Sequence, residues 1–571
     1  MNEITLKAWR FWLIALVLLS LLLALFIRLI FIQVLDTDRG VGFLQRQGDS
    51  RSVRKDPVEA YRGVITDRKG VPIAMSTPVA SIWFDPEFFN PTHQQLTIAA
   101  RILQLPLQDI QEKQIIYAAK RFAYLRKGVS PSIAKQLDKL EIKGLHAKYQ
   151  YKRYYPAGEV TANLLGYTQH DGKGVEGVEF AYDDWLKGKA GYQRVVKDLY
   201  QRTIKVLDQP QDPKHGQNIE LSIDLSVQFL AYKALKRAVN FHAAQAGSIV
   251  VLDNQTGEVL AMASLPSFNP NDRRNLTMAG VRQRAVTDVF EPASTIKPLA
   301  MLAILESGQF KINDEVSTHP GFMRIGNKTL LDPVNYGKLD LTGVITKSSQ
   351  VGMAKLAIAH EPLVIPSMLT RLGFGHYIGT GIPGESGGRL PFETHWSPLE
   401  QAALAYGYGL TVNTLQLAKA YAVIGSKGAS YPISLLKLNE PAIAKQVVSE
   451  VVADQVKAML QSVTGPLGTG KRARTSSYSV AGKTGTSHKV GKGGYELNYV
   501  SLFAGLAPAD NPRISIAVAI DDPQGSRYYG GEVAAPLFAE VAEATLRLLG
   551  EAPDLINGKE ANLVAMTGAR K

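Results

Sequence analysis

Ser294 and Lys297 are the first pair of residues whose types and spacing could perform chemistry. If a helix begins around Ser294, Lys297 lies one turn later on the same face, where its amine can take the proton of the serine hydroxyl. The helix N-terminus would favour negative charge on the serine oxygen, and Pro298 is tolerated in a first turn. Since a Ser-x-x-Lys spacing arises by chance about twice in a chain of this length, a capping serine followed by a surface lysine is the competing interpretation.

Two later stretches could complete such a site. The first, Lys347–Gly352, places Ser348 two residues before the amide of Gln350. A serine hydroxyl near an amide can relay a proton and hold a substrate amide. The second, Ala481–Ser487, contains Lys483, Thr484, Gly485 and Thr486. On a strand it would offer a cation, hydroxyls and a backbone edge to an extended peptide ending in a carboxylate, and its glycine would permit close approach.

The two lysines matter for proton transfer at the serine. Each positive charge disfavours the other, and burial adds to this effect, so Lys297 could be neutral enough at pH 7 to act as the base. The order Ser-x-x-Lys, Ser-x-amide, Lys-Thr-Gly at these wide spacings is far more specific than any one of the motifs. It predicts a serine acyl-transfer enzyme with Ser294 as the nucleophile.

The composition of the 571 residues sets limits on other functions. The chain has no cysteine, which excludes disulfides, thiolate metal sites and cysteine nucleophiles. A formal charge of +13 would attract any polyanion. No nucleic-acid-binding motif appears, however, and the basic residues are scattered along the chain, so we expect no nucleic-acid partner.

An apolar segment near the N-terminus is long enough to span a bilayer. It runs from Phe11 to Ile27 and, after Arg28, resumes through Val34. No Ala-x-Ala site follows, which favours an uncleaved anchor at 11–34 over a removed signal peptide, while a buried soluble helix is the alternative. Lysines and arginines on both sides leave the orientation undecided. Because long domains translocate regardless of flanking charge, we expect residues 1–10 to form a cytoplasmic tail and the rest to lie outside.

The remaining residues indicate two soluble parts in an α+β fold. Short strand-like stretches alternate with turns from about Val53 to Gln228, and no nucleophile–base pairing is visible there. Residues 229–550 begin with a β-hairpin around 248–263 and continue with long helical patterns at 294–306, 399–424 and 533–549 and a strand at 513–521. This mixture predicts an α+β domain of roughly 300 residues. Residues 551–571 have the composition of a flexible tail.

The three motifs, in this order, resemble the penicillin-recognising serine enzymes. Features of the first half resemble the pedestal of class B penicillin-binding proteins; they are Arg62-Gly63 with Asp67, Tyr155-Pro156-x-Gly158 and Gly177-x-Glu179. Within class B, three stretches resemble the cell-division enzymes; they are Arg284–Phe290, Tyr406–Gly409 and Tyr528–Pro536. The resemblance covers about residues 8 to 550, nearly the whole chain. It implies an elongated, mostly-β, non-catalytic pedestal of the dimerisation type at 35–228 and, at 229–550, a transpeptidase domain with an antiparallel sheet flanked by helices.

The resemblance implies a D,D-transpeptidase that cross-links peptidoglycan stem peptides ending in D-Ala-D-Ala during septal cell-wall synthesis. The implied catalytic residues are Ser294, Lys297 and Ser348; the substrate-binding residues are Gln350, Lys483, Thr484, Gly485 and Thr486; the backbone N–H groups of Ser294 and Thr486 form the oxyanion hole. No metal or cofactor is implied. β-Lactams would acylate Ser294. The implied location is the inner membrane with the catalytic domain in the periplasm, beside division proteins that include a lipid-II polymerase.

Two residues depart from the family pattern. Gln350 stands where the family has Asn, so the amide lies one methylene further out, and Ala293 stands where division enzymes commonly have Gly. The departure at Gln350 has two interpretations, a variant paralogue with altered activity or a harmless substitution. The alternative functions are a non-catalytic division scaffold and a membrane-bound β-lactam receptor or β-lactamase.

Overall fold

The computed structural model describes residues 8–33, 42–43, 53–197, 203–207, 211–391, 393, 395–440, 442–491 and 494–555. The chain divides into two compact units. One contains the residues up to Tyr61 together with Gly188–Gly216, and the other contains Arg62–Lys187 together with the residues from Gln217 onward. Most of the predicted tails at 1–10 and 551–571 lies outside the described residues.

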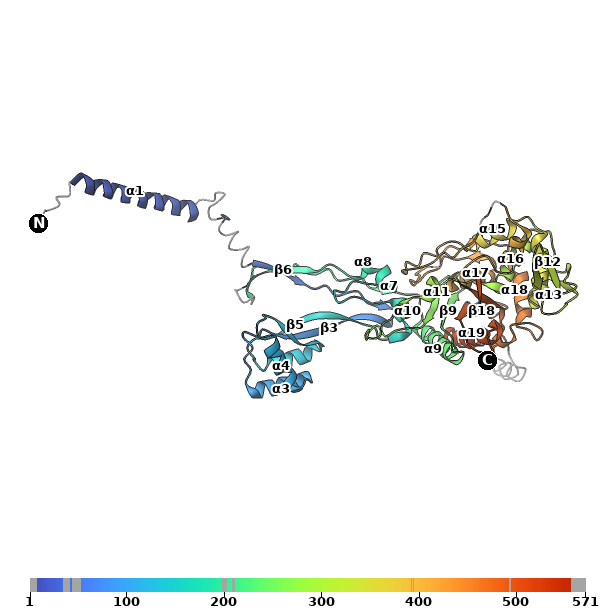
Figure 1. The fold of residues 1–571 in the computed structure, drawn as a ribbon, viewed down its shortest axis with the longest axis horizontal. Helices are drawn as coiled ribbons and strands as arrows, with labels where there is room; N and C mark the ends of the chain where they lie inside the picture. Colours follow the sequence, from blue (N-terminus) through green and yellow to red (C-terminus); the bar gives the residue numbers. More distant parts are fainter. Residues whose placement is uncertain are drawn as a thin grey trace, which may run out of the picture. The chain divides into compact units, whose positions relative to one another are not determined.

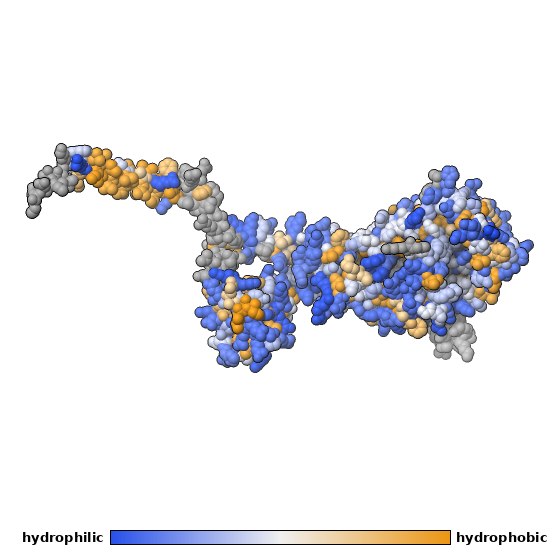
Figure 2. All heavy atoms as spheres, in the orientation of Figure 1, coloured by the Kyte–Doolittle hydropathy of each residue, from blue (hydrophilic) through white to orange (hydrophobic). Residues whose placement is uncertain are grey.

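The first unit contains an apolar helix and a small sheet. Helix α1 (Ala8–Gln33) is long and apolar enough to cross a membrane, and hydrophobic side chains cover most of its length (Figure 2). Strands β1 (Val53–Val58), β6 (Gly191–Lys197) and β7 (Thr203–Val206) form an antiparallel sheet in the order β1-β6-β7. Helix α1 is thus a candidate anchor.

The second unit begins with a sheet built around one long strand. The strands are β2 (Ile65–Thr66), β3 (Pro72–Phe84), β4 (Ala123–Val129), β5 (Leu145–Tyr154) and β8 (Ile219–Glu220). Strand β3 pairs with β5 along most of its length and with β2 and β4 on its other side. Helices α3 (His93–Leu103), α4 (Leu107–Ile116) and α5 (Pro131–Asp138) close a separate core at one end of this sheet (Figure 1). Helices therefore contribute to this part alongside the expected strands.

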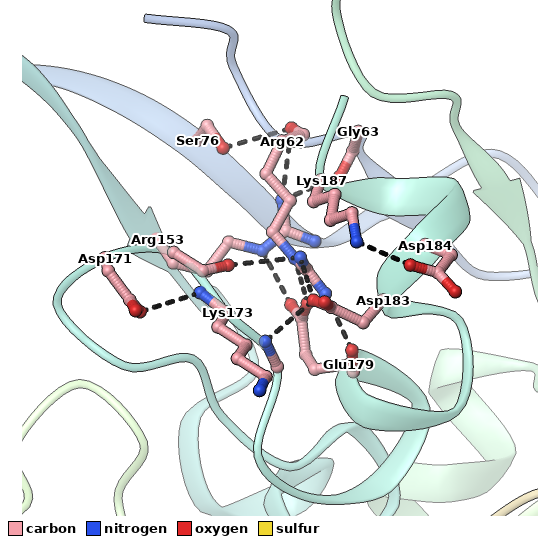
Figure 3. Close-up of polar contacts among 12 residues, drawn as sticks. Arg62, Gly63, Ser76, Arg153, Asp171, Lys173, Glu179, Asp183, Asp184 and Lys187 are labelled. Carbon is pink, nitrogen blue, oxygen red and sulfur yellow. Dashed lines mark hydrogen bonds and ion pairs between the residues drawn. The ribbon is translucent and has the colours of Figure 1, made fainter. Parts of the chain in front are cut away.

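A buried group of charges lies where this sheet meets three short helices, α6 (Ala162–Leu165), α7 (Gly177–Ala181) and α8 (Asp183–Leu186). The guanidinium of Arg62 donates to Glu179 at 2.5 Å and to Asp183 at 2.6 Å, and Arg153 donates to the other oxygen of Glu179 at 2.6 Å (Figure 3). Glu179 is fully buried. The paired charges satisfy one another, which is the condition for burying them.

An antiparallel sheet in the order β10-β9-β19-β18-β17 forms the centre of the rest of the unit (Figure 1). Its strands are β9 (Ala246–Asp253), β10 (Val259–Leu265), β17 (Ala481–Gly491), β18 (Gly494–Ala507) and β19 (Ile514–Asp521). Because side chains alternate across a strand, Ile249 and Val251 belong to one hydrophobic core and Val250 and Leu252 to another. The sheet is covered on both faces, which explains its continuous apolar strands.

Helices α9 (Leu225–Phe241) and α19 (Gly530–Leu549) pack together on the face of the sheet that carries Ile249 and Val251. Asp224 caps α9, which begins before the predicted boundary at residue 228. The helices associated with the opposite core are α11 (Arg284–Thr287), α12 (Lys297–Glu306), α13 (Leu341–Thr346), α14 (Gln350–Ile358), α15 (Val364–Arg371), α16 (Pro398–Ala405), α17 (Thr414–Gly425) and α18 (Glu450–Thr464). The smaller elements are α10 (Met278–Val281), β11 (Glu315–Ser317), β12 (Phe322–Ile325), β13 (Lys328–Leu331), β14 (Lys338–Asp340), β15 (Ala429–Ser430) and β16 (Lys445–Gln446).

Two of the predicted helices differ from the structure. The pattern at 399–424 is not one helix, because α16 ends at Ala405 and α17 begins at Thr414. The intervening Gly407 and Gly409 have φ of +91° and +79°, which a helix does not accommodate. The helix expected from Ser294 begins at Lys297 instead. The predicted hairpin, the strand at 513–521 and the helix at 533–549 are confirmed.

Candidate active site

Ser294 lies in a single 3₁₀ turn, Ala293–Thr295, directly before α12. Ala293 adopts φ of +46°, a conformation unfavourable for a residue with a Cβ atom. Its N–H donates to the carbonyl oxygen of Gly407 at 3.0 Å, which ties the turn to the loop between α16 and α17. Pro298 is accommodated in the first turn of α12 as expected. The half-buried serine is thus held in a constrained turn at the start of a helix.

The structure brings residues of all three sequence motifs together. The ammonium of Lys297 donates to the carbonyl oxygen of Ser348 and, at 3.2 Å, to its hydroxyl. The ammonium of Lys483 reaches the same hydroxyl at 2.9 Å. The hydroxyl of Ser294 takes part in none of these three bonds. Ser348 is therefore shared between two lysines that lie 186 positions apart in the sequence.

Burial lowers the pKa of both lysines. Lys297 is 1% exposed and Lys483 is fully buried. Burial lowers the pKa of Lys297 to about 7, against an opposing effect of the negative charge of Asp332. Burial, and then the charge of Lys297, hold the pKa of Lys483 well below its ordinary value. The lowered pKa of Lys297 is in the predicted direction, but burial causes it, and the expected effect of one lysine's charge on the other acts on Lys483 alone.

The second motif is fixed by a carboxylate that the sequence did not reveal. Asp332 accepts hydrogen bonds from the hydroxyl of Ser349 at 2.5 Å and from the N–H of Gln350 at 2.6 Å. These bonds hold the first turn of α14, just after Ser348, whose φ is +57°. Among the described residues, no hydrogen bond involves the side-chain amide of Gln350. Asp332 lies 18 positions before Gln350 and matches no motif, so only the fold identifies it.

The third motif lies on β17, at the edge of the sheet. The hydroxyl of Thr484 shares a 2.9 Å hydrogen bond with Thr469, and that of Thr486 accepts from the N–H of Gly530 at 3.0 Å. A Cβ atom at Gly485 would lie 2.9 Å from Thr295 and 3.1 Å from the carbonyl oxygen of Pro292. This glycine therefore permits close packing of β17 against the turn that carries Ser294, in addition to any role toward a substrate.

The carboxylate of Glu291 is a further group near the nucleophile to which sequence reasoning gave no role. It is 8% exposed and accepts hydrogen bonds from the N–H of Gly409 at 2.9 Å and the hydroxyl of Tyr495 at 3.2 Å. The only feature of the sequence that could have pointed to Glu291 is its position three residues before Ser294. No group of three or more histidine, aspartate or glutamate residues in the described part of the chain could hold a metal ion.

Two buried lysines share the hydroxyl of Ser348, and Ser294 precedes the helix that carries one of them. Together with a Lys-Thr-Gly strand at the edge of an antiparallel sheet, this arrangement defines a penicillin-recognising serine enzyme. Residues 247–543 match the family described as the penicillin binding protein transpeptidase domain, and residues 57–221 match the penicillin-binding protein dimerisation domain. The chain therefore belongs to the penicillin-binding proteins, in the class B group that resembles penicillin-binding protein 3.

Relatives and solved structures agree with this assignment. The chain is 40% identical to the Escherichia coli K12 protein named peptidoglycan D,D-transpeptidase FtsI, over 97% of this chain and 94% of that protein. It is 41% identical to the Pseudomonas aeruginosa protein named "Probable peptidoglycan D,D-transpeptidase PbpC", over 97% of this chain and 98% of that protein. The structure resembles that of penicillin-binding protein 3 from Mycobacterium tuberculosis in complex with aztreonam, with a TM-score of 0.68, 28% identity and coverage of 87% of this chain and 98% of that one.

Proposed function

We propose that this protein is a peptidoglycan D,D-transpeptidase that cross-links stem peptides through an acyl-enzyme on Ser294. The observation that carries the proposal is the hydroxyl of Ser348, which lies within hydrogen-bonding distance of both buried lysines, next to the turn that holds Ser294. The names of the relatives support the same activity.

The first step of the proposed reaction forms the acyl-enzyme. With a pKa of about 7, Lys297 is neutral in about half of the molecules at pH 7 and can accept the proton of Ser294. The serine oxygen then attacks the carbonyl carbon of the penultimate D-alanine. The C–N bond to the terminal D-alanine breaks, and Ser348 passes a proton to the leaving amine. β-Lactams would acylate Ser294 by the same route.

Other residues would bind the substrate and the developing charge. The backbone N–H groups of Ser294 and Thr486 would stabilise the oxyanion. The groups proposed to hold the peptide and its carboxylate are those of Gln350, Lys483, Thr484, Gly485 and Thr486. Because Gln350 has its amide free of hydrogen bonds to the described residues, that amide is available to a substrate.

The proposal includes a location and partners. Helix α1 would anchor the chain in the inner membrane, with residues 1–10 in the cytoplasm and the pedestal and transpeptidase domains in the periplasm. The pedestal would contact membrane proteins of the division machinery, including a lipid-II polymerase, during septum formation. The transpeptidase domain would include α9 from Leu225, since this helix packs against the sheet that carries the third motif.

Labelling with a fluorescent penicillin tests the proposed activity. The full-length chain in detergent should form a covalent adduct that persists for many minutes, and Ser294→Ala should form none. Ser307→Ala is the matched control, because Ser307 is an exposed serine at the opposite end of α12 and should leave labelling unchanged. Absence of labelling in the unmodified protein would refute the proposed enzymatic activity, and rapid turnover of the drug would indicate a β-lactamase.

A further inference from the structure

A cavity of about 380 Å³ lies beside the segment that leads to the nucleophile. Its walls come from residues 282–291, from the far end of β17 at His488–Val490 and from the start of β9. Glu291 lines it, three positions before Ser294. The three sequence motifs contribute none of the residues that line this cavity.

Glu291 carries an unsatisfied charge into this region. One carboxylate oxygen accepts from Gly409 and Tyr495, whereas the other is buried and has no hydrogen-bond partner among the described residues. A buried carboxylate oxygen without a partner is costly unless a ligand supplies a donor. Burial and the charge of Glu291 both raise the pKa of Tyr495, so this tyrosine stays a neutral donor and does not cancel the carboxylate.

The cations of the cavity are already paired with other carboxylates. Arg282 and Arg284 both form ion pairs with Asp288, and Lys489 pairs with Asp521 at 2.9 Å. No lysine, arginine or histidine that the structure describes forms an ion pair with Glu291. The three cations of the lining are thus held by Asp288 and Asp521, and Glu291 is the carboxylate of the lining that has no ion pair among the described residues. A cation brought by a ligand would be its complement.

The loop between α16 and α17 fixes this carboxylate relative to the nucleophile. The carbonyl oxygen of Gly407 accepts from Ala293, and the N–H of Gly409 donates to Glu291. The same short loop thus positions the turn of Ser294 and the orientation of the carboxylate. A cation bound at Glu291 would be held at a defined place beside the acyl-enzyme.

We propose that Glu291 binds the ammonium group of the peptide that accepts the acyl chain. This inference rests on the proposed transpeptidase function, which requires an amine to attack the Ser294 ester. At neutral pH such an amine is mostly protonated, and a carboxylate concentrates and orients it. Overall, the ester and the ammonium give an amide, the free Ser294 hydroxyl and one proton that leaves to solvent.

Partitioning of the acyl-enzyme between aminolysis and hydrolysis tests this inference. The full-length chain in detergent is acylated with an N-benzoyl-D-alanyl thioester, a donor without an amine, in the presence of D-alanine as acceptor. Glu291→Gln should lower the ratio of amide product to hydrolysis product by about tenfold or more, the cost of losing a charge-assisted hydrogen bond. Glu400→Gln is the matched control, because Glu400 is an exposed carboxylate that caps α16 and does not line the cavity.

The ratio is measured within the acylated population, so molecules that fail to fold do not contribute to it. A second arm compares a donor that carries a side-chain ammonium with its N-acetylated twin. If Glu291→Gln slows acylation by the ammonium donor alone and leaves the ratio unchanged, the carboxylate binds an ammonium of the donor, and the acceptor assignment is overturned. If neither quantity changes, the site is not an ammonium site. If the unmodified chain releases no thiol at all, the proposed function fails together with this inference.

Discussion

The pKa of Lys297 makes the pH dependence of acylation the most direct test of the site. A lysine with its ordinary pKa of 10.5 would be neutral in about 0.03% of molecules at pH 7, whereas a pKa of about 7 leaves about half of them neutral. If neutral Lys297 accepts the proton of Ser294, the rate should rise about tenfold from pH 6 to pH 8 and then level off. The rate is the second-order constant for labelling of the full-length chain by a fluorescent penicillin.

Asp332→Asn provides the second half of the test. The negative charge of Asp332 raises the pKa of Lys297, so its removal lowers that pKa further. The midpoint of the pH profile should therefore move below about 7, even though losing the carboxylate also weakens the first turn of α14 and reduces the maximal rate. A purely structural role of Asp332 would lower the rate at every pH and leave the midpoint in place.

Two results would refute this reasoning. A profile that keeps rising toward pH 10 would mean that Lys297 keeps its ordinary pKa and that burial does not neutralise it. A midpoint that moves upward in Asp332→Asn would mean that the carboxylate does not act on Lys297 through its charge. Ser307→Ala, which leaves the charges of the site unchanged, should reproduce the profile of the unmodified chain.

Three further predictions follow from backbone and charge. Gly407→Ala should slow acylation by more than tenfold, because the added Cβ would lie 2.0 Å from the carbonyl oxygen of Ala293. In Gly409→Ala the added Cβ would meet nothing within 4 Å, so this variant should be slowed only by the strain of its positive φ. Equal rates of labelling for the two variants would contradict this prediction. Ala293→Gly should raise the free energy of unfolding in denaturant by up to about 1 kcal/mol, because its φ of +46° suits glycine; a decrease would show that the turn is unstrained. Glu179→Gln should lower the free energy of unfolding by about 3–5 kcal/mol, since Arg62 and Arg153 would keep buried charges without their carboxylate. A change below about 1 kcal/mol would mean that water reaches these buried charges.

Much of the site could be predicted from the sequence because its chemistry depends on local motifs. Ser294, Lys297, Ser348 and Lys483 were predicted from residue type, spacing and order, and the structure brings the side chains of Lys297, Ser348 and Lys483 together. The hairpin around residues 248–263 was recognisable since two apolar runs flank a turn. Each of these features depends on residues that lie close together in the sequence.

What the sequence could not indicate depends on contacts between distant residues. Asp332 was missed because its partners lie 17 to 19 positions later and nothing in its own neighbourhood marks it. The break between α16 and α17, in contrast, has local signals that the prediction did not use, namely the two glycines at 407 and 409 and the capping box of Asn413 and Gln416 at the start of α17. The lowered pKa of Lys297 was expected in direction, but its size depends on burial, which the fold alone determines.

The sharing of one serine hydroxyl by two buried amines has a consequence for inhibitors. An anion placed beside Lys297 and Lys483 stabilises their protonated forms, so its binding should draw protons from solvent. The reversible affinity of an anionic ligand should then increase with acidity, whereas acylation of Ser294 needs Lys297 without its extra proton. A compound that binds tightly as an anion and a compound that reacts quickly should therefore have different pH optima on the same protein.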